Sequence, residues 1–254
     1  MNRTESIIKI RKKLSQGHVS LGSWMQLPDS SVAEIMGKSS YDWVAVDLEH
    51  GSIGLHQLPS IFRALELGGT LPLVRLAEGS SKDCKHALDA GAGGVIIPMV
   101  ENAEQLNTVR NFCSWPPSGK RGVGFSRANL FGKYFKDYFE EAQNPLLIAM
   151  IESVEATKNL ESILQVKGLD AVFIGPYDLS ASMGLTAKFD DKKFIKTIEK
   201  ILSLSKKYSV ACGIHIVKPI QNDLTNRIDE GYKFIAYSMD SVFLSTVCEN
   251  PIKT

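Results

Sequence analysis

Short apolar segments that are rich in β-branched residues recur along the chain and predict strands. Most of them lack a strict alternation of apolar and polar positions, which is typical of strands covered on both faces, as in a parallel sheet. The eight predicted strands span Ser20–Leu27, Trp43–Glu49, Leu71–Leu76, Gly93–Val100, Pro145–Glu152, Ala171–Gly175, Val210–Val217 and Lys233–Met239.

Helical segments alternate with these strands, and their order predicts the fold class. Most of the strands start 22 to 28 residues after the previous one, which is close to the length of a strand–helix–strand unit. Eight such units favour an α/β protein that forms one closed (β/α)8 TIM barrel over residues 1–254. The helices are expected at Ser6–Leu14, Ser30–Lys38, Leu55–Leu67, Ser81–Ala90, Ala103–Phe112, Val154–Gln165, Lys192–Lys207 and Pro219–Glu230.

One connection is much longer than the others. More than 40 residues separate the fourth and fifth strands, and the segment Trp115–Tyr138 is rich in glycine, aromatic and basic residues. Long loops that follow barrel strands lie on the active-site face. We therefore expect an active-site loop at about residues 115–140, with a contact between subunits as the alternative; both roles are compatible.

Composition and charge exclude several classes of partner. The net charge is +1 and charged residues make up 22% of the chain, so no electrostatic argument favours nucleic acid or a membrane surface. The longest apolar runs are far shorter than the ~20 residues that cross a bilayer, and no apolar signal core follows the N-terminus. The four cysteines form no Cys-x-x-Cys motif, so we expect reduced thiols in a soluble, cytoplasmic protein.

Reactive side chains gather at the carboxyl ends of the predicted strands. Barrel enzymes build their active sites from these ends, and several buried titratable groups need a charge partner or a metal to be tolerated. The residues are Asp47, Glu49, His50, Arg75, Glu152, Tyr177 and Asp178.

Glu152 and Asp178 are candidate ligands of a divalent metal. Two carboxylates facing one cavity leave coordination positions for water and substrate, as Mg²⁺ or Mn²⁺ prefers. Each acid also has a simpler interpretation, because Glu152 suits a helix start and Asp178 suits an N-cap. A closed zinc site is disfavoured, since the sequence has neither a His-x-x-x-His motif nor a cysteine cluster.

His50 and Arg75 are the candidate catalytic residues. His50 stands beside two acids, which favours a general base over a structural histidine. Arg75 either forms a buried ion pair with Asp47 or Glu49, or binds an oxygen that becomes negative during the reaction. His215 is a weaker candidate for the base. No lysine lies at a strand centre, so nothing suggests a Schiff base.

Seven motifs along residues 20–245 resemble the HpcH/HpaI family of class II pyruvate aldolases. They read GSWMQLPD, DLEHG, LVRL, LDAGAGGVIIPMVE, KRGVG, IES and FIGPYDLSASMG, in that order, with the second and the last the most specific. The resemblance implies a (β/α)8 barrel that assembles as a homo-oligomer, a trimer or a hexamer, with exchanged C-terminal helices. It also implies cleavage of a 4-hydroxy-2-oxo acid to pyruvate and an aldehyde.

The resemblance also implies roles for single residues. His50 corresponds to the base, Arg75 to the group that stabilises the transition state, and Asp89 to the acid that orients His50. Glu152 and Asp178 correspond to the ligands of a divalent metal ion, which is Mg²⁺, Mn²⁺ or Co²⁺.

Two positions of the substrate pocket depart from the family pattern. The backbone at Tyr177 and Asp178 is expected to hold the carboxylate of the oxo acid, and Tyr177 stands where the family has a small residue. Met150 stands where the family has a glutamine that contacts the oxo acid, and methionine cannot donate a hydrogen bond.

Three alternatives remain open at this point. The first is another carbon–carbon reaction on the same barrel, such as a citrate-synthase-like condensation or the decarboxylation of an oxo acid, and Met150 is the residue that raises it. The second is an oxo-acid-binding protein without catalytic activity. The third is a phosphate-binding barrel, which is weakly supported because the last two loops lack a glycine-rich phosphate motif.

Overall fold

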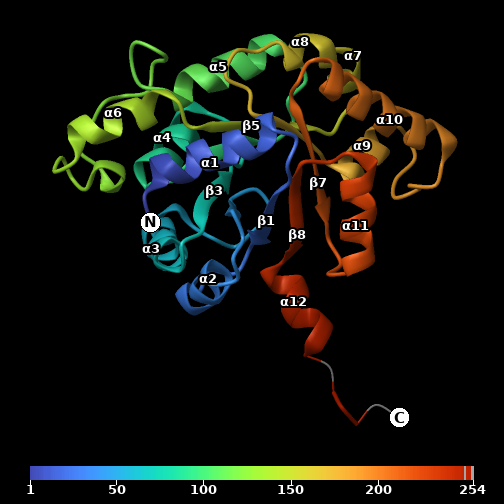
Figure 1. The fold of residues 1–254 in the computed structure, drawn as a ribbon, viewed down its shortest axis with the longest axis horizontal. Helices are drawn as coiled ribbons and strands as arrows, with labels where there is room; N and C mark the ends of the chain where they lie inside the picture. The colour runs from blue at the N-terminus through green and yellow to red at the C-terminus, as the bar shows by residue number, and fades with distance from the viewer. Residues whose placement is uncertain (249, 253–254) are drawn as a thin grey trace.

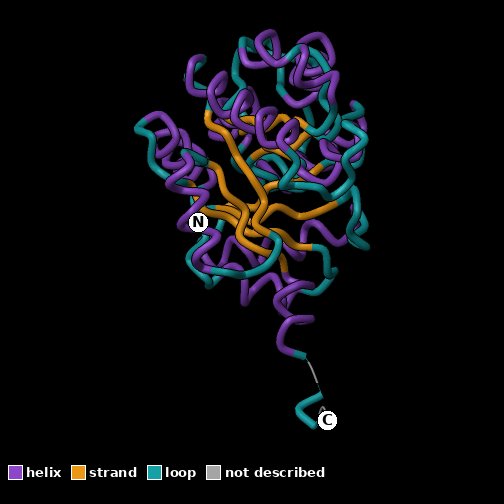
Figure 2. The backbone as a smooth tube through the Cα atoms, turned by 90° about the vertical axis from the view of Figure 1, so that its right-hand side faces the viewer, coloured by secondary structure: helices purple, strands orange, loops and turns teal. Residues whose placement is uncertain are grey.

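Eight parallel strands close into a barrel in chain order (Figures 1 and 2). The computed structural model describes residues 1–248 and 250–252. Every strand lies within the range predicted for it, so the predicted (β/α)8 barrel is confirmed. The strands are β1 Ser20–Met25, β2 Trp43–Asp47, β3 Leu71–Arg75, β4 Gly94–Ile97, β5 Leu146–Ile151, β6 Ala171–Ile174, β7 Ala211–Ile216 and β8 Phe234–Met239.

Helices surround the barrel and cover its outer face (Figure 2). No helix in the described part of the chain is long and apolar enough to cross a membrane. The α-helices are α1 Arg3–Ser15, α2 Ser30–Gly37, α3 Leu58–Gly68, α4 Ser81–Asp89, α5 Ala103–Cys113, α6 Phe135–Gln143, α7 Val154–Lys158, α8 Leu160–Leu164, α9 Pro176–Ser182, α10 Lys192–Lys207, α11 Gln221–Glu230 and α12 Asp240–Val247, and the short 3-10 helices are η1 Leu55–Gln57 and η2 Arg127–Asn129.

The strands separate two apolar layers, which explains why their sequences show little alternation. One layer fills the inside of the barrel and includes Trp24, Trp43, Phe173 and Phe234. The other lies between the strands and the helices. Inside the barrel, the rings of Trp43 and Phe234 stack with centroids 4.3 Å apart. Gly22 makes room for this stack, because a Cβ atom there would lie 2.2 Å from the Trp43 ring.

Helix α1 closes the N-terminal end of the barrel. Its residues Ile7 and Ile10 are buried in the inner layer. Arg11 of the same helix pairs with Asp170, with the Nε and Oδ1 atoms 2.7 Å apart. The predicted chemistry must therefore lie at the opposite end, where the strands terminate.

The long segment predicted as an active-site loop lies at the N-terminal end of the barrel, away from the active-site end of the same chain. Helix α5 follows β4 directly, so the extra length falls between α5 and β5. A connection from a helix to the next strand lies at the N-terminal end of the barrel, whereas the active site lies at the C-terminal end. The segment 114–144 includes η2 and α6, which the sequence pattern did not predict.

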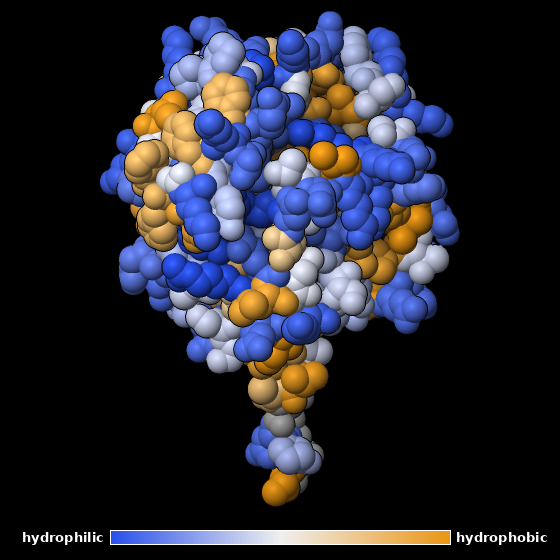
Figure 3. Space-filling model, turned by 60° about the vertical axis from the view of Figure 1, so that its left-hand side comes forward, coloured by the Kyte–Doolittle hydropathy of each residue, from blue (hydrophilic) through white to orange (hydrophobic). Residues whose placement is uncertain are grey.

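Three further differences concern helices. The single helix predicted over Val154–Gln165 is divided into α7 and α8 at Asn159. Helices α9 and α12 were not expected. Helix α12 projects from the body of the protein in Figures 1 and 3, and its residues Leu244 and Val247 are 46% and 76% exposed. Apolar side chains are therefore left uncovered on this projection.

Candidate active site

A buried ion pair joins the ends of β2 and β3. The Nε atom of Arg75 donates to Oδ1 of Asp47 at 2.9 Å, and Nη2 donates to Oδ2 at 2.5 Å. The two residues are register partners on adjacent strands. Burial alone would raise the pKa of Asp47, but the hydrogen bonds and charge of Arg75 outweigh it and lower the pKa to about 2. The guanidinium is thus held in one orientation by a fixed anion.

The same guanidinium reaches a second acid. Its Nη1 atom lies 2.8 Å from Oε2 of Glu49, so Arg75 pairs with both of the acids that were considered for it. The pKa of Glu49 is raised by burial, although the charge of Arg75 opposes that effect. An ion pair does not exclude a catalytic role, because an arginine has five N–H donors.

His50 lies directly after this ion-paired cluster. Its backbone N–H donates to Oδ1 of Asp47 at 3.2 Å, and the N–H of Glu49 donates to the same oxygen at 3.0 Å. Asp47 therefore fixes both the turn that carries His50 and the guanidinium of Arg75. The His50 residue is exposed, as a base that receives a proton from a substrate must be.

Glu152 is a buried carboxylate at the end of β5. It is only 3% exposed, and its Oε1 atom accepts a hydrogen bond from the backbone N–H of Met99 at 2.5 Å. No lysine or arginine of residues 1–248 and 250–252 forms an ion pair with it. Burial is the main cause that raises the pKa of Glu152 to about 7, and the nearby acids Glu49 and Asp178 add to the effect.

Gly175 packs closely against this carboxylate. A Cβ atom at position 175 would lie 2.5 Å from Oε2 of Glu152 and 3.4 Å from the terminal methyl carbon of Met150. Any side chain there would therefore displace the carboxylate of Glu152. Glycine at the end of β6 thus allows the Glu152 carboxylate to pack directly against the backbone at this position.

Asp178 lies in the first turn of α9, beyond that glycine. It is exposed, as is Tyr177 before it. Its charge contributes to raising the pKa of both Glu49 and Glu152. The interpretation of Asp178 as an N-cap is wrong, because Gly175 occupies that position.

Glu152 and Asp178 provide a suitable donor set for a divalent cation, although a small one. Among the described residues, no group of three or more His, Cys, Asp or Glu side chains could hold a metal ion. A buried carboxylate without a cation and an exposed carboxylate near it supply two hard oxygen donors. Mg²⁺ is commonly bound by one or two carboxylates, with the other positions taken by water or substrate.

The inner wall of the site is made by Met150, Trp24 and His215. Met150 belongs to the inner apolar layer and is 4% exposed. The guanidinium carbon of Arg75 lies 5.2 Å from the centroid of the Trp24 ring, and the His215 ring stacks on Trp24 at the same distance. His215 thus lies in the site, close to the arginine.

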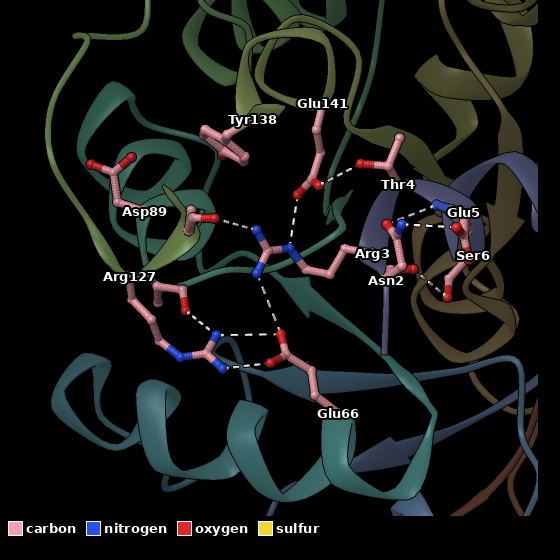
Figure 4. Close-up of polar contacts among 12 residues, drawn as sticks. Asn2, Arg3, Thr4, Glu5, Ser6, Glu66, Asp89, Arg127, Tyr138 and Glu141 are labelled. Carbon is pink, nitrogen blue, oxygen red and sulfur yellow. Dashed lines mark hydrogen bonds and ion pairs between the residues drawn. The ribbon is translucent and has the colours of Figure 1, made fainter. Parts of the chain in front are cut away.

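Asp89 does not reach His50 within one chain. It is the last residue of α4, and this helix leads down to the start of β4, so Asp89 lies at the N-terminal end of the barrel. Burial raises its pKa, and the nearest cation is Arg121, with an oxygen-to-nitrogen distance of 4.0 Å. Figure 4 shows Asp89 in the same region as Arg127 and Tyr138. Orientation of His50 by this acid therefore requires a second chain.

Two further residues, Gln26 and Asp240, make hydrogen bonds that hold the site in place, and the sequence pattern did not predict them. The Nε2 atom of Gln26 donates to Oδ2 of Asp47 at 3.0 Å. Asp240 accepts hydrogen bonds from the backbone N–H groups of Gln26 and Leu27, both at 2.9 Å. The signal available in the sequence was a polar residue directly after each of two strands, Gln26 after β1 and Asp240 after β8. The ends of these adjacent strands meet in a closed barrel.

Comparison with known proteins agrees with this arrangement. Residues 20–246 match the family described as HpcH/HpaI aldolase/citrate lyase. The chain is 35% identical over 238 residues to a hydroxypyruvate/pyruvate aldolase of Roseobacter denitrificans, an alignment that covers 92% of this chain and 91% of the relative. It is 34% identical over 243 residues to a 2-keto-3-deoxy-L-rhamnonate aldolase of Salmonella gallinarum, which covers 94% and 90% of the two chains.

A solved structure supports the same assignment. A crystal structure of an HpcH/HpaI aldolase/citrate lyase family protein from Burkholderia cenocepacia superposes with a TM-score of 0.88 and 28% identity, and covers 94% of this chain and 95% of that one. The prediction of a carbon–carbon lyase of the aldolase type is confirmed by the family and by its named relatives. The chain belongs to the HpcH/HpaI aldolase/citrate lyase family.

Proposed function

We propose that this protein is a divalent-metal-dependent lyase that cleaves a 4-hydroxy-2-oxo acid into pyruvate and an aldehyde, and that it also catalyses the reverse addition. The observation that carries the proposal is Glu152, a buried carboxylate that lies near Asp178 and has no cationic partner among the described residues. Both residues lie at the barrel end that holds Arg75 and His50. The aldolase names of the relatives support the same reaction class.

Glu152 and Asp178 would hold the metal ion. A bound Mg²⁺, Mn²⁺ or Co²⁺ would act as a Lewis acid toward the oxo acid and favour its enolate form. The exposed Asp178 leaves access for the substrate. The backbone of Tyr177 and Asp178, in the first turn of α9, would bind the substrate carboxylate, because N–H groups at a helix start favour anions.

His50 would act as the general base. Its imidazole would take the proton from the 4-hydroxyl group of the substrate, the bond between C3 and C4 would break, and the hydroxyl carbon would leave as the aldehyde. The remaining three carbons would form the pyruvate enolate, which becomes pyruvate when C3 accepts a proton. A positioned base typically contributes about 10²- to 10⁴-fold to the rate.

Arg75 would stabilise the negative charge that develops on the substrate. Asp47 and Glu49 hold its guanidinium, so little reorganisation is needed when charge develops. Cationic donors that are fixed before the reaction starts stabilise the transition state more than mobile ones do.

We infer that a second copy of the chain completes the site with Asp89. Within one chain Asp89 and His50 lie at opposite ends of the barrel, so orientation of His50 by Asp89 requires the partner's copy. The segment that follows Arg121 carries exposed apolar residues, which suit an interface between subunits; they are Val123, Phe125, Leu130, Phe131 and Tyr134. The projecting α12 is a second apolar contact for a trimer or a hexamer.

The charges of the long segment have a structural role in this proposal. Arg121 is buried and donates to the hydroxyl of Tyr138 at 2.9 Å, and Arg127 pairs with Glu66 at 2.6 Å. Lys120 and Lys133, which are exposed, remain available to an acidic acceptor substrate.

Met150 favours a second candidate function, a different carbon–carbon reaction of an oxo acid on the same site. Its thioether cannot donate the hydrogen bond that a glutamine donates at this position. A citrate-synthase-like condensation or a decarboxylation would use the same metal ligands and the same arginine.

A product screen separates the two candidates. The protein is incubated with a panel of 4-hydroxy-2-oxo acids and, separately, with oxaloacetate, each with and without Mg²⁺, Mn²⁺ or Co²⁺. We expect metal-dependent release of pyruvate together with an aldehyde from at least one hydroxy-oxo acid. Turnover of oxaloacetate alone would favour the second candidate, and no turnover of either class would contradict the proposed function.

A further inference from the structure

His215 is a polar residue on the inner wall that the proposed reaction does not use. It lies in β7 and pairs in register with Ala236, a member of the inner apolar layer. Its ring stacks on Trp24 with centroids 5.2 Å apart and planes inclined by 22°. The guanidinium of Arg75 also lies over the Trp24 ring. The imidazole is therefore part of the substrate pocket and has a fixed orientation.

The hydrogen bond of His215 defines which of its nitrogens carries the proton. Its Nε2 atom lies 3.0 Å from the backbone carbonyl oxygen of Ser238. A carbonyl oxygen can only accept, so Nε2 must be the protonated nitrogen. Burial lowers the pKa of His215 to about 4, so the ring is neutral near pH 7. Its other nitrogen, Nδ1, then has a free lone pair and acts only as an acceptor.

This acceptor is available to a ligand. Nδ1 has no hydrogen-bond partner among the described residues, and it is not one of their fully buried unpaired atoms. It therefore faces space that a water molecule or a substrate atom can reach. Because the two ring nitrogens point in very different directions, the contact of Nε2 with β8 directs Nδ1 away from that strand.

We propose that His215 determines the choice of the oxo-acid substrate, with Nδ1 accepting a hydrogen bond from a hydroxyl group on C3 of a 2-oxo acid. The inference rests on the proposed function, because it assigns a group on the substrate of that same site. The shared contact with Trp24 places the imidazole close to the guanidinium of Arg75, which would stabilise the charge on the oxo acid. A methyl group at C3, as in pyruvate, has no proton to donate to Nδ1. A hydroxymethyl group, as in hydroxypyruvate, has one.

A competition experiment in the direction of aldol addition tests the inference. The wild-type protein and His215→Leu are each given equal concentrations of pyruvate and hydroxypyruvate together with Mn²⁺ and one aldehyde, and the two addition products are quantified by NMR. The experiment is run once with a hydroxylated aldehyde and once with an aldehyde that has no hydroxyl group. The product ratio does not depend on how much of each preparation is folded. We expect the ratio of the hydroxypyruvate product to the pyruvate product to fall about 2- to 12-fold in His215→Leu, which corresponds to the loss of one neutral hydrogen bond.

A second variant separates hydrogen bonding from shape. His215→Gln retains an acceptor oxygen, so we expect it to restore part of the preference, whereas His215→Leu does not. An unchanged product ratio in both variants would overturn the inference while leaving the proposed function intact. A change confined to hydroxylated aldehydes would also overturn it, because the acceptor would then face the aldehyde. Absence of any addition product in the wild-type protein would contradict the proposed function itself.

Discussion

The two ends of the barrel both collect buried charge, but they balance it differently. At the N-terminal end, the half-buried Glu66 and the buried Glu141 are each paired with an arginine. Arg3 of α1 pairs with Glu141 of α6 at 2.8 Å and with Glu66 of α3 at 3.5 Å, so these ion pairs link the three helices (Figure 4). Arg127 also pairs with Glu66, at 2.6 Å. At the C-terminal end, Glu152 has no such partner within the described chain and keeps a raised pKa.

This difference distinguishes a structural ionic network from a reactive site. A cationic partner stabilises the ionised form of a carboxylate. A paired carboxylate therefore stabilises the folded protein, and it gains little free energy from binding a further cation. A buried carboxylate without a partner destabilises the folded protein when it ionises, and a bound cation removes that penalty. The imbalance of charge, more than the number of charges, therefore marks the functional end of this barrel.

The largest effect is expected from removal of the base at the C-terminal end. His50→Ala should lower kcat about 10²- to 10⁴-fold while changing oxo-acid binding much less. His18→Ala is the matched control, because His18 is also exposed but lies before β1 at the other end. Steady-state kinetics of both variants check this, and a near-wild-type kcat for His50→Ala would place the base elsewhere.

Met150→Gln should raise the activity on pyruvate-forming substrates. The new amide would lie on the inner wall beside Glu152 and donate a hydrogen bond to the bound oxo acid. Such a bond to a charged group is worth about 1.5–3 kcal/mol, or about 10- to 150-fold in kcat/KM. Slower cleavage of every 4-hydroxy-2-oxo acid tested would instead show that Met150 is matched to a more apolar substrate.

The metal-free protein should lose stability as the pH rises from about 4.5 to about 7. In the unfolded chain Glu152 loses its proton near its ordinary pKa of 4.5, whereas in the folded protein its pKa is about 7. The folded state then binds more protons in this window, so the free energy of unfolding falls with increasing pH. At about 1.4 kcal/mol per pH unit, the loss is at most about 3 kcal/mol.

Urea unfolding at several pH values, with a chelator present to remove metal, measures how the free energy of unfolding changes with pH. Glu152→Gln cannot ionise, so its free energy of unfolding should lack the Glu152 contribution and change less over the same window. If the free energy of unfolding changed equally with pH in the two proteins, Glu152 would already be ionised in the folded state over this pH window. Added Mn²⁺ should stabilise the wild-type protein more at pH 8 than at pH 5, because the metal competes with a proton.

The smallest effect on catalysis is expected at the N-terminal end. Glu141→Gln should lower the free energy of unfolding by about 1–3 kcal/mol, because the carboxylate that binds Arg3 and Thr4 is lost. The kcat of the folded enzyme should not change. Thermal unfolding and kinetics on the same preparation test both statements, and a large fall in kcat without a loss of stability would contradict the comparison of the two ends.

The strands and the site at the C-terminal end were predictable from the sequence because their signals are local. Buried strands read as apolar segments, and residues such as Arg75 and Glu152 stand out where such a segment ends. The partners of Arg75 were left open, since an ion pair across two strands depends on register. In the structure it binds both Asp47 and Glu49.

The position of the long segment was not predictable in the same way. Its length is visible in the sequence, but whether it follows a strand or a helix depends on where α5 lies. Asp89 was assigned a role beside His50 from its motif alone, and motifs carry no information about which end of the barrel, or which chain, a residue occupies. Helix α9 was missed because its short sequence begins with Gly-Pro, which reads as a turn.

Metal dependence of the wild-type protein and of Glu152→Gln tests the central claim most directly. Pyruvate release is measured after exhaustive chelation and after addition of Mg²⁺, Mn²⁺ or Co²⁺, and Mn²⁺ binding is followed by electron paramagnetic resonance. We expect activity to disappear on chelation and to return with metal, and we expect Glu152→Gln to bind Mn²⁺ much more weakly. Full turnover without metal, or an adduct trapped by borohydride, would contradict the assignment of Glu152 as the centre of the site.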